Sequence, residues 1–273
     1  MSSDLSNPVA PQILFATDFA EPSRRALACV KHLAHLRNAS VRAFHVIDIV
    51  DVDDRSWFSV RDSAERRLRD VRRELRLAGI ANTATVISGG TASQAIHAAV
   101  VKYKPELLVL GLHGERMIMG PSIGATALGI LRKSRYPVIT VGPQAHAPEP
   151  APESASGPFA RVLFVTDVLR ESLSAVLRAW PVAKEQRAPL LAVLPPSRIN
   201  PNFSLGRWKQ FASIRLLPGD EAAGIVLAEL VSGSFDLLVV GIRAGRYMDA
   251  LLGGATLHTL ISQAPCPVLT MRS

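Results

Sequence analysis

Several classes of protein are disfavoured by what this chain lacks. It has two cysteines, three tryptophans and three tyrosines, and aromatic residues make up 5% of its 273 residues. No hydrophobic stretch reaches the ~18–20 uninterrupted apolar residues that a membrane helix needs. The first residues, MSSDLSNPVAPQ, have neither a basic start nor an apolar core, so they do not resemble a secretory signal. We therefore expect a cytoplasmic protein.

The scarcity of cysteine has further consequences. Cys29 falls in a helical pattern and Cys266 lies beside an expected strand, which is typical of buried, inert thiols. Nothing in the sequence supports a disulfide between them. No spacing of cysteine and histidine resembles a metal site, and no spacing of serine, histidine and aspartate marks a nucleophile with its base. We expect neither a metal ligand nor a catalytic residue.

The charge balance is basic, with 31 Lys and Arg, 23 Asp and Glu, and a net charge of +8. The densest basic segment, RDSAERRLRDVRRELR at 61–76, also holds four acidic residues. Its apolar residues recur every three or four positions, which predicts an amphipathic helix with a solvated charged face. The segment has no tyrosine or tryptophan on which bases could stack. Nucleic acid is therefore an unlikely partner.

What the chain does contain is a glycine pattern that occurs twice. A hydrophobic run ends at Gly111, and Gly124 follows after 13 residues. A second run ends at Gly241, and Gly254 follows at the same distance. In both copies the second glycine begins a Gly-Ala-Thr sequence. This repeat predicts two similar domains.

We place the first domain at 1–143, a linker rich in proline and alanine at 144–159, and a shorter second domain at 160–273. The first copy predicts strands at 13–17, 41–47, 84–87, 107–110 and 138–141, and helices at 22–36, 60–78, 92–102 and 126–133. This alternation predicts an α/β fold of two consecutive, doubly wound, five-stranded parallel sheets, similar to flavodoxin or Rossmann domains. The linker composition predicts an extended spacer without packing capacity.

The second copy is about 18 residues shorter between its second and third strands, where the first copy has its arginine-rich helix. Prolines at 195, 196 and 201 prevent an equivalent long helix there. We therefore expect the second domain to lack one covering helix.

These motifs together resemble the universal stress protein family. The resemblance rests on ILFATDFAEPSRRAL at the start, FHVID at the second strand, the Gly-x-x-Gly-(nine residues)-Gly spacing and the final YPVITV. It covers 11–143 well and 160–273 more weakly, so the chain looks like a tandem member with two such domains. Last strands pair domains back to back in this family. The resemblance therefore implies that the two halves pair with each other.

The residues themselves indicate where a ligand would bind. In an open parallel sheet, ligands bind beyond the carboxyl ends of the strands, where the strand order reverses. Asp18, Val46 and Gly111 lie at such ends. Gly111 and Gly114 would let the backbone approach a phosphate. Gly124 opens a helix whose first N–H groups favour an anion.

The resemblance implies that positions matching Asp18, Val46, Gly111, Gly114 and Gly124 contact ATP. The expected nucleotide-binding residues are Ala16, Asp18, Val46, Gly111, His113, Gly114, Gly124, Ala125 and Thr126. The family usually has Ser or Thr after the last glycine, where a hydroxyl holds a phosphate. This chain has alanine there in both copies, at Ala125 and Ala255.

The second copy departs further from the pattern, with Ala244 in place of the second glycine. We expect it to be a structural partner rather than a nucleotide site.

Two interpretations of function stay open. In the first, the chain is a regulatory or stress-response protein that binds ATP or a related adenine nucleotide, with Mg²⁺, in its first domain, and hydrolyses it slowly at most. In the second, it is a nucleotide-free dimerisation or protein-interaction module whose glycines serve only tight turns and close packing. A homodimer is compatible with both. A flavin carrier is disfavoured, because the chain has no phosphate loop rich in Ser and Thr.

Overall fold

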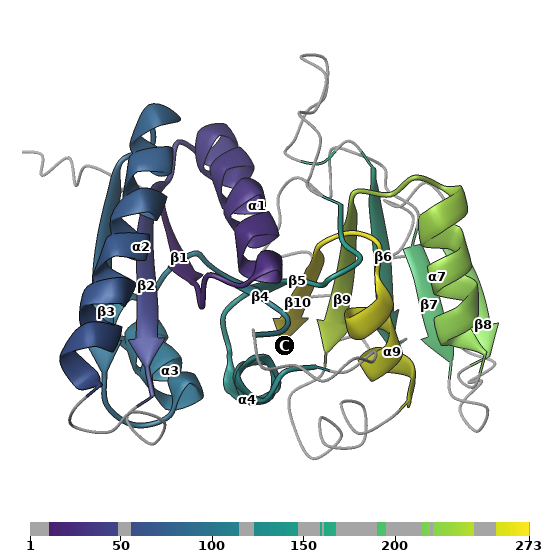
Figure 1. The fold of residues 1–273 in the computed structure, drawn as a ribbon. Helices are drawn as coiled ribbons and strands as arrows, with labels where there is room; N and C mark the ends of the chain where they lie inside the picture. Colours follow the sequence, from purple (N-terminus) through teal and green to yellow (C-terminus); the bar gives the residue numbers. More distant parts are fainter. Residues whose placement is uncertain are drawn as a thin grey trace, which may run out of the picture.

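The computed structural model describes residues 11–48, 56–114, 123–146, 159, 161–167, 190–194, 214–218, 221–242 and 255–272. In these residues, ten strands form one sheet in the order β3-β2-β1-β4-β5-β10-β9-β6-β7-β8 (Figure 1). The strands of the N-terminal half are β1 (Gln12–Ala16), β2 (Ser40–Ile47), β3 (Asn82–Ser88), β4 (Leu107–Gly111) and β5 (Val138–Val141). Those of the C-terminal half are β6 (Val162–Asp167), β7 (Leu190–Leu194), β8 (Ile214–Pro218), β9 (Leu237–Ile242) and β10 (Val268–Arg272).

The two halves have the same strand order. All neighbouring strands within a half are parallel, and the order is 3-2-1-4-5 in the first half and 8-7-6-9-10 in the second. The halves meet through β5 and β10, which pair antiparallel with Ile139 opposite Leu269. The α/β fold with a mostly parallel sheet, predicted from the sequence, is confirmed.

Helices cover both faces of this sheet (Figure 1). On one face, α1 (Glu21–Arg37) and α2 (Trp57–Leu77) pack over the N-terminal half. On the other face lie α3 (Ala92–Tyr103) and α4 (Ala125–Lys133) of the first half and α7 (Ala222–Ser232) and α9 (Ala255–Gln263) of the second. Each layer shares one hydrophobic cluster that runs across both halves. The helix expected to be missing from the second half would fall within 195–213, outside the described residues.

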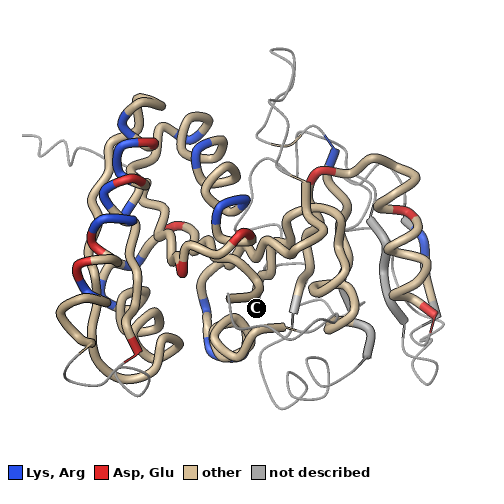
Figure 2. Tube along the Cα trace, viewed as in Figure 1, with Lys and Arg blue, Asp and Glu red and all other residues tan. Residues whose placement is uncertain are grey.

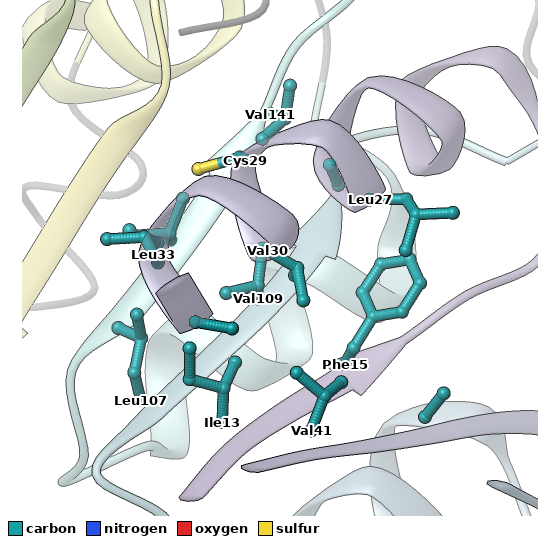
Figure 3. Close-up of a cluster of buried hydrophobic side chains, with 14 of the residues drawn as sticks. Ile13, Phe15, Leu27, Cys29, Val30, Leu33, Val41, Leu107, Val109 and Val141 are labelled. Carbon is teal, nitrogen blue, oxygen red and sulfur yellow. The ribbon is translucent and has the colours of Figure 1, made fainter. Parts of the chain in front are cut away.

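The core beneath α1 shows why this sequence forms a layered fold. Val30 and Leu33 are fully buried and lie over the sheet residues Ile13, Phe15 and Val109 (Figure 3). These strand residues alternate with others, such as Leu14, that belong to the cluster on the opposite face. A strand buried on both faces is therefore apolar along its whole length, as expected for a central parallel strand.

Helix α2 has the amphipathic pattern predicted from its sequence. Its buried residues Ala64, Leu68, Val71 and Leu75 follow the helical period and face the sheet. Basic and acidic residues alternate along its outer surface (Figure 2). One example is the ion pair between Arg61 and Glu65, one turn apart. Such a mixed surface stabilises the helix weakly and leaves no single-sign patch along it.

The expected linker packs against the core at both of its ends. Ala145 is fully buried, and Phe159 is 1% exposed and packs edge-on against His32 of α1. Arg25 donates hydrogen bonds to the carbonyl oxygens of Pro143 and Ala145. The expectation that this segment has no packing capacity is therefore wrong at its ends, and 147–158 lie outside the described residues.

No helix in the described ranges is both long enough and apolar enough to cross a membrane.

Candidate functional site

The strand order predicts a ligand crevice beyond the carboxyl ends of β1 and β4. The two strands are neighbours, with Phe15 opposite Val109. The chain leaves β1 toward β2 on one side and leaves β4 toward β5 on the other. In open α/β sheets, this reversal of direction separates the connecting loops and opens a binding crevice at the carboxyl ends of the strands. Ala16 and Gly111 are the last residues of the two strands.

Asp18 follows the end of β1 and brings a carboxylate to this edge of the sheet. Its Oδ1 accepts a 2.6 Å hydrogen bond from the Ser23 hydroxyl and a 3.0 Å bond from the Ala20 N–H. Both donors belong to the start of α1, whose first turn also holds Pro22. A carboxylate at a helix N-terminus satisfies backbone donors that lack intrahelical partners. The α1 start therefore fixes the orientation of Asp18.

Gly114 lies against the other oxygen of this carboxylate. A Cβ placed on Gly114 would be 2.8 Å from Asp18 Oδ2. A side chain at 114 would therefore push the Asp18 carboxylate out of its present position, and glycine lets the loop after β4 approach it. The structure thus brings together two of the predicted site residues that are 96 positions apart in the sequence (18 and 114).

Gly124 closes the loop on its far side. Its N–H donates a 3.1 Å hydrogen bond to the Leu112 carbonyl, and a Cβ at 124 would lie 2.9 Å from that same oxygen. Gly124 is also the N-cap of α4, and as a glycine it has no side chain with which to cap the helix. Ala125 is exposed and Thr126 half-buried in the first turn. The first N–H groups of a helix lack intrahelical partners, and such a helix start favours an anion.

Gly111 has a different environment from the one expected. A Cβ at Gly111 would lie 2.8 Å from the Ser23 nitrogen and 3.0 Å from the Pro22 carbonyl carbon. The start of α1 fills the space that we expected to accommodate a phosphate. The requirement for glycine at 111 therefore arises from helix packing, and a contact between Gly111 and nucleotide stays a prediction.

Val46 presents its backbone to the crevice through strand register. In a parallel ladder, residues two apart on one strand bond to the same neighbour. The Phe44 carbonyl accepts a 3.0 Å hydrogen bond from Thr17, just beyond the end of β1. The N–H and C=O of Val46 therefore point to the same side, past the point at which β1 ends. Its side chain is partly buried and packs with the cluster beneath α3 and α4.

His113 is buried rather than exposed on the loop. It is 6% exposed, and neither ring nitrogen has a hydrogen-bond partner among the described residues. Burial lowers the pKa of His113 below its ordinary value, and the charge of His258 on α9 lowers it further. An imidazole in this environment is neutral at pH 7. The β4–α4 loop of the first half is therefore electrostatically coupled to a helix of the second.

Sequence reasoning missed Ser23, Thr17 and Phe19. Ser23 is 3% exposed and bonded to Asp18, and the Thr17 hydroxyl accepts a 3.0 Å bond from the Phe19 N–H. Phe19 has a φ of 68°, in the left-handed region that a bulky side chain rarely adopts. The available signal was the sequence from Asp18 to Ser23, in which Asp, Pro and Ser surround a helix start.

The second half is described only in part at the equivalent place. Asp167 ends β6, Gly241 lies within β9, and Ala255 begins α9. Ala244 and Gly254 lie outside the described residues. In the described part of the chain, no three His, Cys, Asp or Glu side chains gather as a metal-binding group.

The fold and the crevice define an α/β protein of the doubly wound class, with the site at the reversal of strand order. Residues 11–142 match the model of the Universal stress protein family, so this segment forms a universal stress protein domain. Universal stress protein MJ0577 from Methanocaldococcus jannaschii is 23% identical over 156 residues, which cover 48% of this chain and 93% of that protein.

Solved structures resemble the chain over nearly its whole length. A universal stress protein from Archaeoglobus fulgidus DSM 4304 has a TM-score of 0.71 and 19% identity, covering 96% of this chain and 98% of its own. A putative universal stress protein from Pseudomonas aeruginosa UCBPP-PA14 has a TM-score of 0.61 and 14% identity, and the match covers 97% of this chain and 94% of that protein. At these identities, the likeness shows the fold.

Proposed function

We propose that this chain is a tandem universal stress protein that binds ATP or a related adenine nucleotide in its first domain and acts in regulation or stress response. The proposed domains are 1–143 and 160–273, joined by 144–159. The family match at 11–142 and the repeated strand order of the two halves support this assignment. We further propose that the protein works in the cytoplasm and that its two domains pair through β5 and β10.

One observation carries the nucleotide proposal. At the reversal of strand order, the Asp18 carboxylate lies against Gly114 of the loop after β4, and the same loop leads into α4 at its glycine N-cap, Gly124. A carboxylate can accept hydrogen bonds from a ribose, and the α4 N–H groups can hold a phosphate. The Val46 backbone, directed past the end of β1, can pair with the edge of an adenine. The residues at this edge thus fit the three parts of an adenine nucleotide.

Magnesium fits this site only together with the nucleotide. Mg²⁺ keeps several waters and is commonly held by one or two carboxylates plus substrate phosphates. Asp18 Oδ1 is already engaged by Ser23 and Ala20. We therefore propose that Mg²⁺, where bound, is held mainly by phosphate oxygens. We assign no residue as a catalyst of rapid ATP hydrolysis.

The second candidate is a nucleotide-free interaction module. It is favoured by the close packing beside two of the glycines: a Cβ at Gly111 would lie 2.8 Å from the Ser23 nitrogen, and a Cβ at Gly124 would lie 2.9 Å from the Leu112 oxygen. The chain's own packing is enough to require glycine at these two positions. The two candidates differ in whether purified protein binds nucleotide.

Calorimetry with ATP and Mg²⁺ tests the proposal. We expect a stoichiometry near one per chain, and tighter binding by Ala125→Ser, because this exposed position would regain the hydroxyl that the family usually has. One hydrogen bond to a charged phosphate is worth ~1.5–3 kcal/mol, so the gain is about tenfold or more. Ala255→Ser, at the equivalent position of the second half, is the matched control and should leave the affinity unchanged. Absence of heat with wild type and with Ala125→Ser favours the interaction module.

A further inference from the structure

A compact stack of three side chains lies directly beside Asp18. The rings of Phe19 and His45 are stacked with their centroids 4.7 Å apart. The guanidinium carbon of Arg67 lies 4.6 Å from the centre of the Phe19 ring. The three residues come from the β1–α1 loop, β2 and α2, so the stack connects three separate elements.

Both ends of this stack are tied to the backbone around Asp18. Arg67 donates a 3.4 Å hydrogen bond to the Phe19 carbonyl. The His45 Nδ1 lies 2.8 Å from the Thr17 carbonyl, to which it donates. The two carbonyls belong to the residues immediately before and after Asp18. The stack therefore constrains the chain on both sides of the carboxylate.

The residue at the centre of the stack has an unfavourable backbone conformation. Phe19 has a φ of 68°, and it is 9% exposed. A bulky residue stays in the left-handed region only where its surroundings over-determine it, and such strain clusters at binding sites. The contacts of Phe19 with Arg67 and His45 provide that constraint. If Phe19 relaxed, the preceding peptide would rotate and the Asp18 carboxylate would move away from Gly114.

Arg67 occupies a distinctive place among the arginines of α2. It adjoins Leu68 on the flank of the buried stripe, whereas neighbouring Arg66 pairs with Asp62 on the outer surface. We propose that Arg67 is a positioning residue, which holds Phe19 in its left-handed conformation and thereby fixes the Asp18 carboxylate at the nucleotide crevice. The part of this inference that concerns nucleotide affinity rests on the proposed function.

The positioning has a readout that needs no nucleotide. The Ala20 N–H donates to Asp18 Oδ1, so its hydrogen exchange reports whether the carboxylate stays in place. We expect the Ala20 amide to exchange about two- to tenfold faster in Arg67→Ala, the range given by one cation–π contact and one hydrogen bond. Arg66→Ala is the matched control and should leave this rate unchanged. Lysine at 67 keeps the charge but not the planar stacking, so the Ala20 exchange rate in Arg67→Lys should lie between those of wild type and Arg67→Ala.

The same variants then test the link to ligand binding. ATP affinity should weaken about two- to tenfold in Arg67→Ala and stay unchanged in Arg66→Ala, while the melting temperatures of the two variants agree within ~2 °C. If wild type binds no ATP, the proposed function fails, and the Ala20 exchange rates still decide whether Arg67 positions Asp18. Equal Ala20 exchange in Arg67→Ala and Arg66→Ala overturns the inference.

A double-mutant cycle excludes an indirect effect. Glycine adopts a φ of 68° without strain, so Phe19→Gly removes the ring without forcing the backbone to change. In that background, Arg67→Ala should raise the Ala20 exchange rate by less than it does in wild type, because the ring contact is gone and only the hydrogen bond to the carbonyl of residue 19 can still be lost. A full additive increase would show that Arg67 acts by a route other than Phe19 and would overturn the proposal.

Discussion

Gly111 of β4 packs directly against the backbone of Ser23 in α1. A Cβ on Gly111 would lie 2.8 Å from the Ser23 nitrogen and 2.9 Å from its Oγ. The same Ser23 hydroxyl donates to Asp18. The glycine that ends β4 therefore positions the helix start that orients the carboxylate of the crevice, so packing and site geometry depend on one another.

This contact predicts that Gly111→Ala destabilises the fold even without ligand. The added methyl group has to displace backbone atoms of α1, which typically costs ~1–3 kcal/mol. Urea unfolding measures the loss. Gly224→Ala is the matched control, because Gly224 is an exposed residue of α7 with no atom within 4 Å of its Cβ position. That change should stabilise by ~0.5–1 kcal/mol. Equal effects of the two substitutions would contradict the packing role.

Ser23→Ala should lower the free energy of unfolding by ~1.5–3 kcal/mol, because it removes a partly buried hydrogen bond to a carboxylate. The Asp18 carboxylate would keep the Ala20 N–H as a donor but lose its 2.6 Å partner. Chemical unfolding provides the measurement, and Ser59→Ala, at an exposed position of α2, is the control. A loss no larger than that of the control would show that the hydroxyl does not stabilise the start of α1.

The buried His113 predicts a pH dependence of stability. Its pKa in the folded state lies below the ordinary value, so the unfolded state binds more protons between that lowered pKa and ~6.5. Stability from this residue is therefore present above pH 6.5 and is lost as the pH falls through that window. Wild type should lose more stability between pH 7.5 and 5.5 than His113→Leu, as measured by urea unfolding.

A leucine at 113 leaves no buried nitrogen without a partner, so it should be tolerated at neutral pH. His35→Leu, at an exposed position of α1, is the control and should keep the pH dependence of wild type. The hypothesis fails if His113→Leu shows the same pH dependence as wild type.

The two thiols should be inert in the folded protein. Burial raises the pKa of Cys29 to about 12, and burial together with Asp236 raises that of Cys266 to about 12. At pH 8 only ~1 in 10⁴ of such thiols is ionised, and the thiolate is the reactive form. A chromogenic disulfide reagent should therefore react with neither thiol in native buffer within minutes and with both in denaturant. Rapid native reaction of either thiol would contradict this expectation.

The sequence predicted most elements of the first half because their patterns are local. The expected strand at 138–141 matches β5, and the expected helix at 22–36 lies within α1, whose C-cap Asn38 adopts the left-handed conformation. Helix α2 begins three residues earlier than predicted, at Trp57, which continues the apolar period before Val60 and packs against the same cluster.

The features that escaped prediction depend on contacts between distant segments. The charge interaction of His113 with His258 arises between the two halves, and the need for glycine at 111 follows from the approach of α1. The left-handed Phe19 depends on Arg67 and His45. Sequence patterns report the period of one element, but they do not report which elements meet across the sheet. The prediction that the nine site residues bind nucleotide stays a prediction.

Because β5 and β10 belong to one chain, their antiparallel junction does not depend on protein concentration. A junction between two separate subunits dissociates on dilution, whereas one formed within a single polypeptide does not depend on protein concentration. The two partners are also free to differ, since each is specified by its own stretch of the chain. His113 can face His258 on one side of the junction without any requirement that the other side carry the same pair, an asymmetry that identical subunits related by a two-fold axis cannot have.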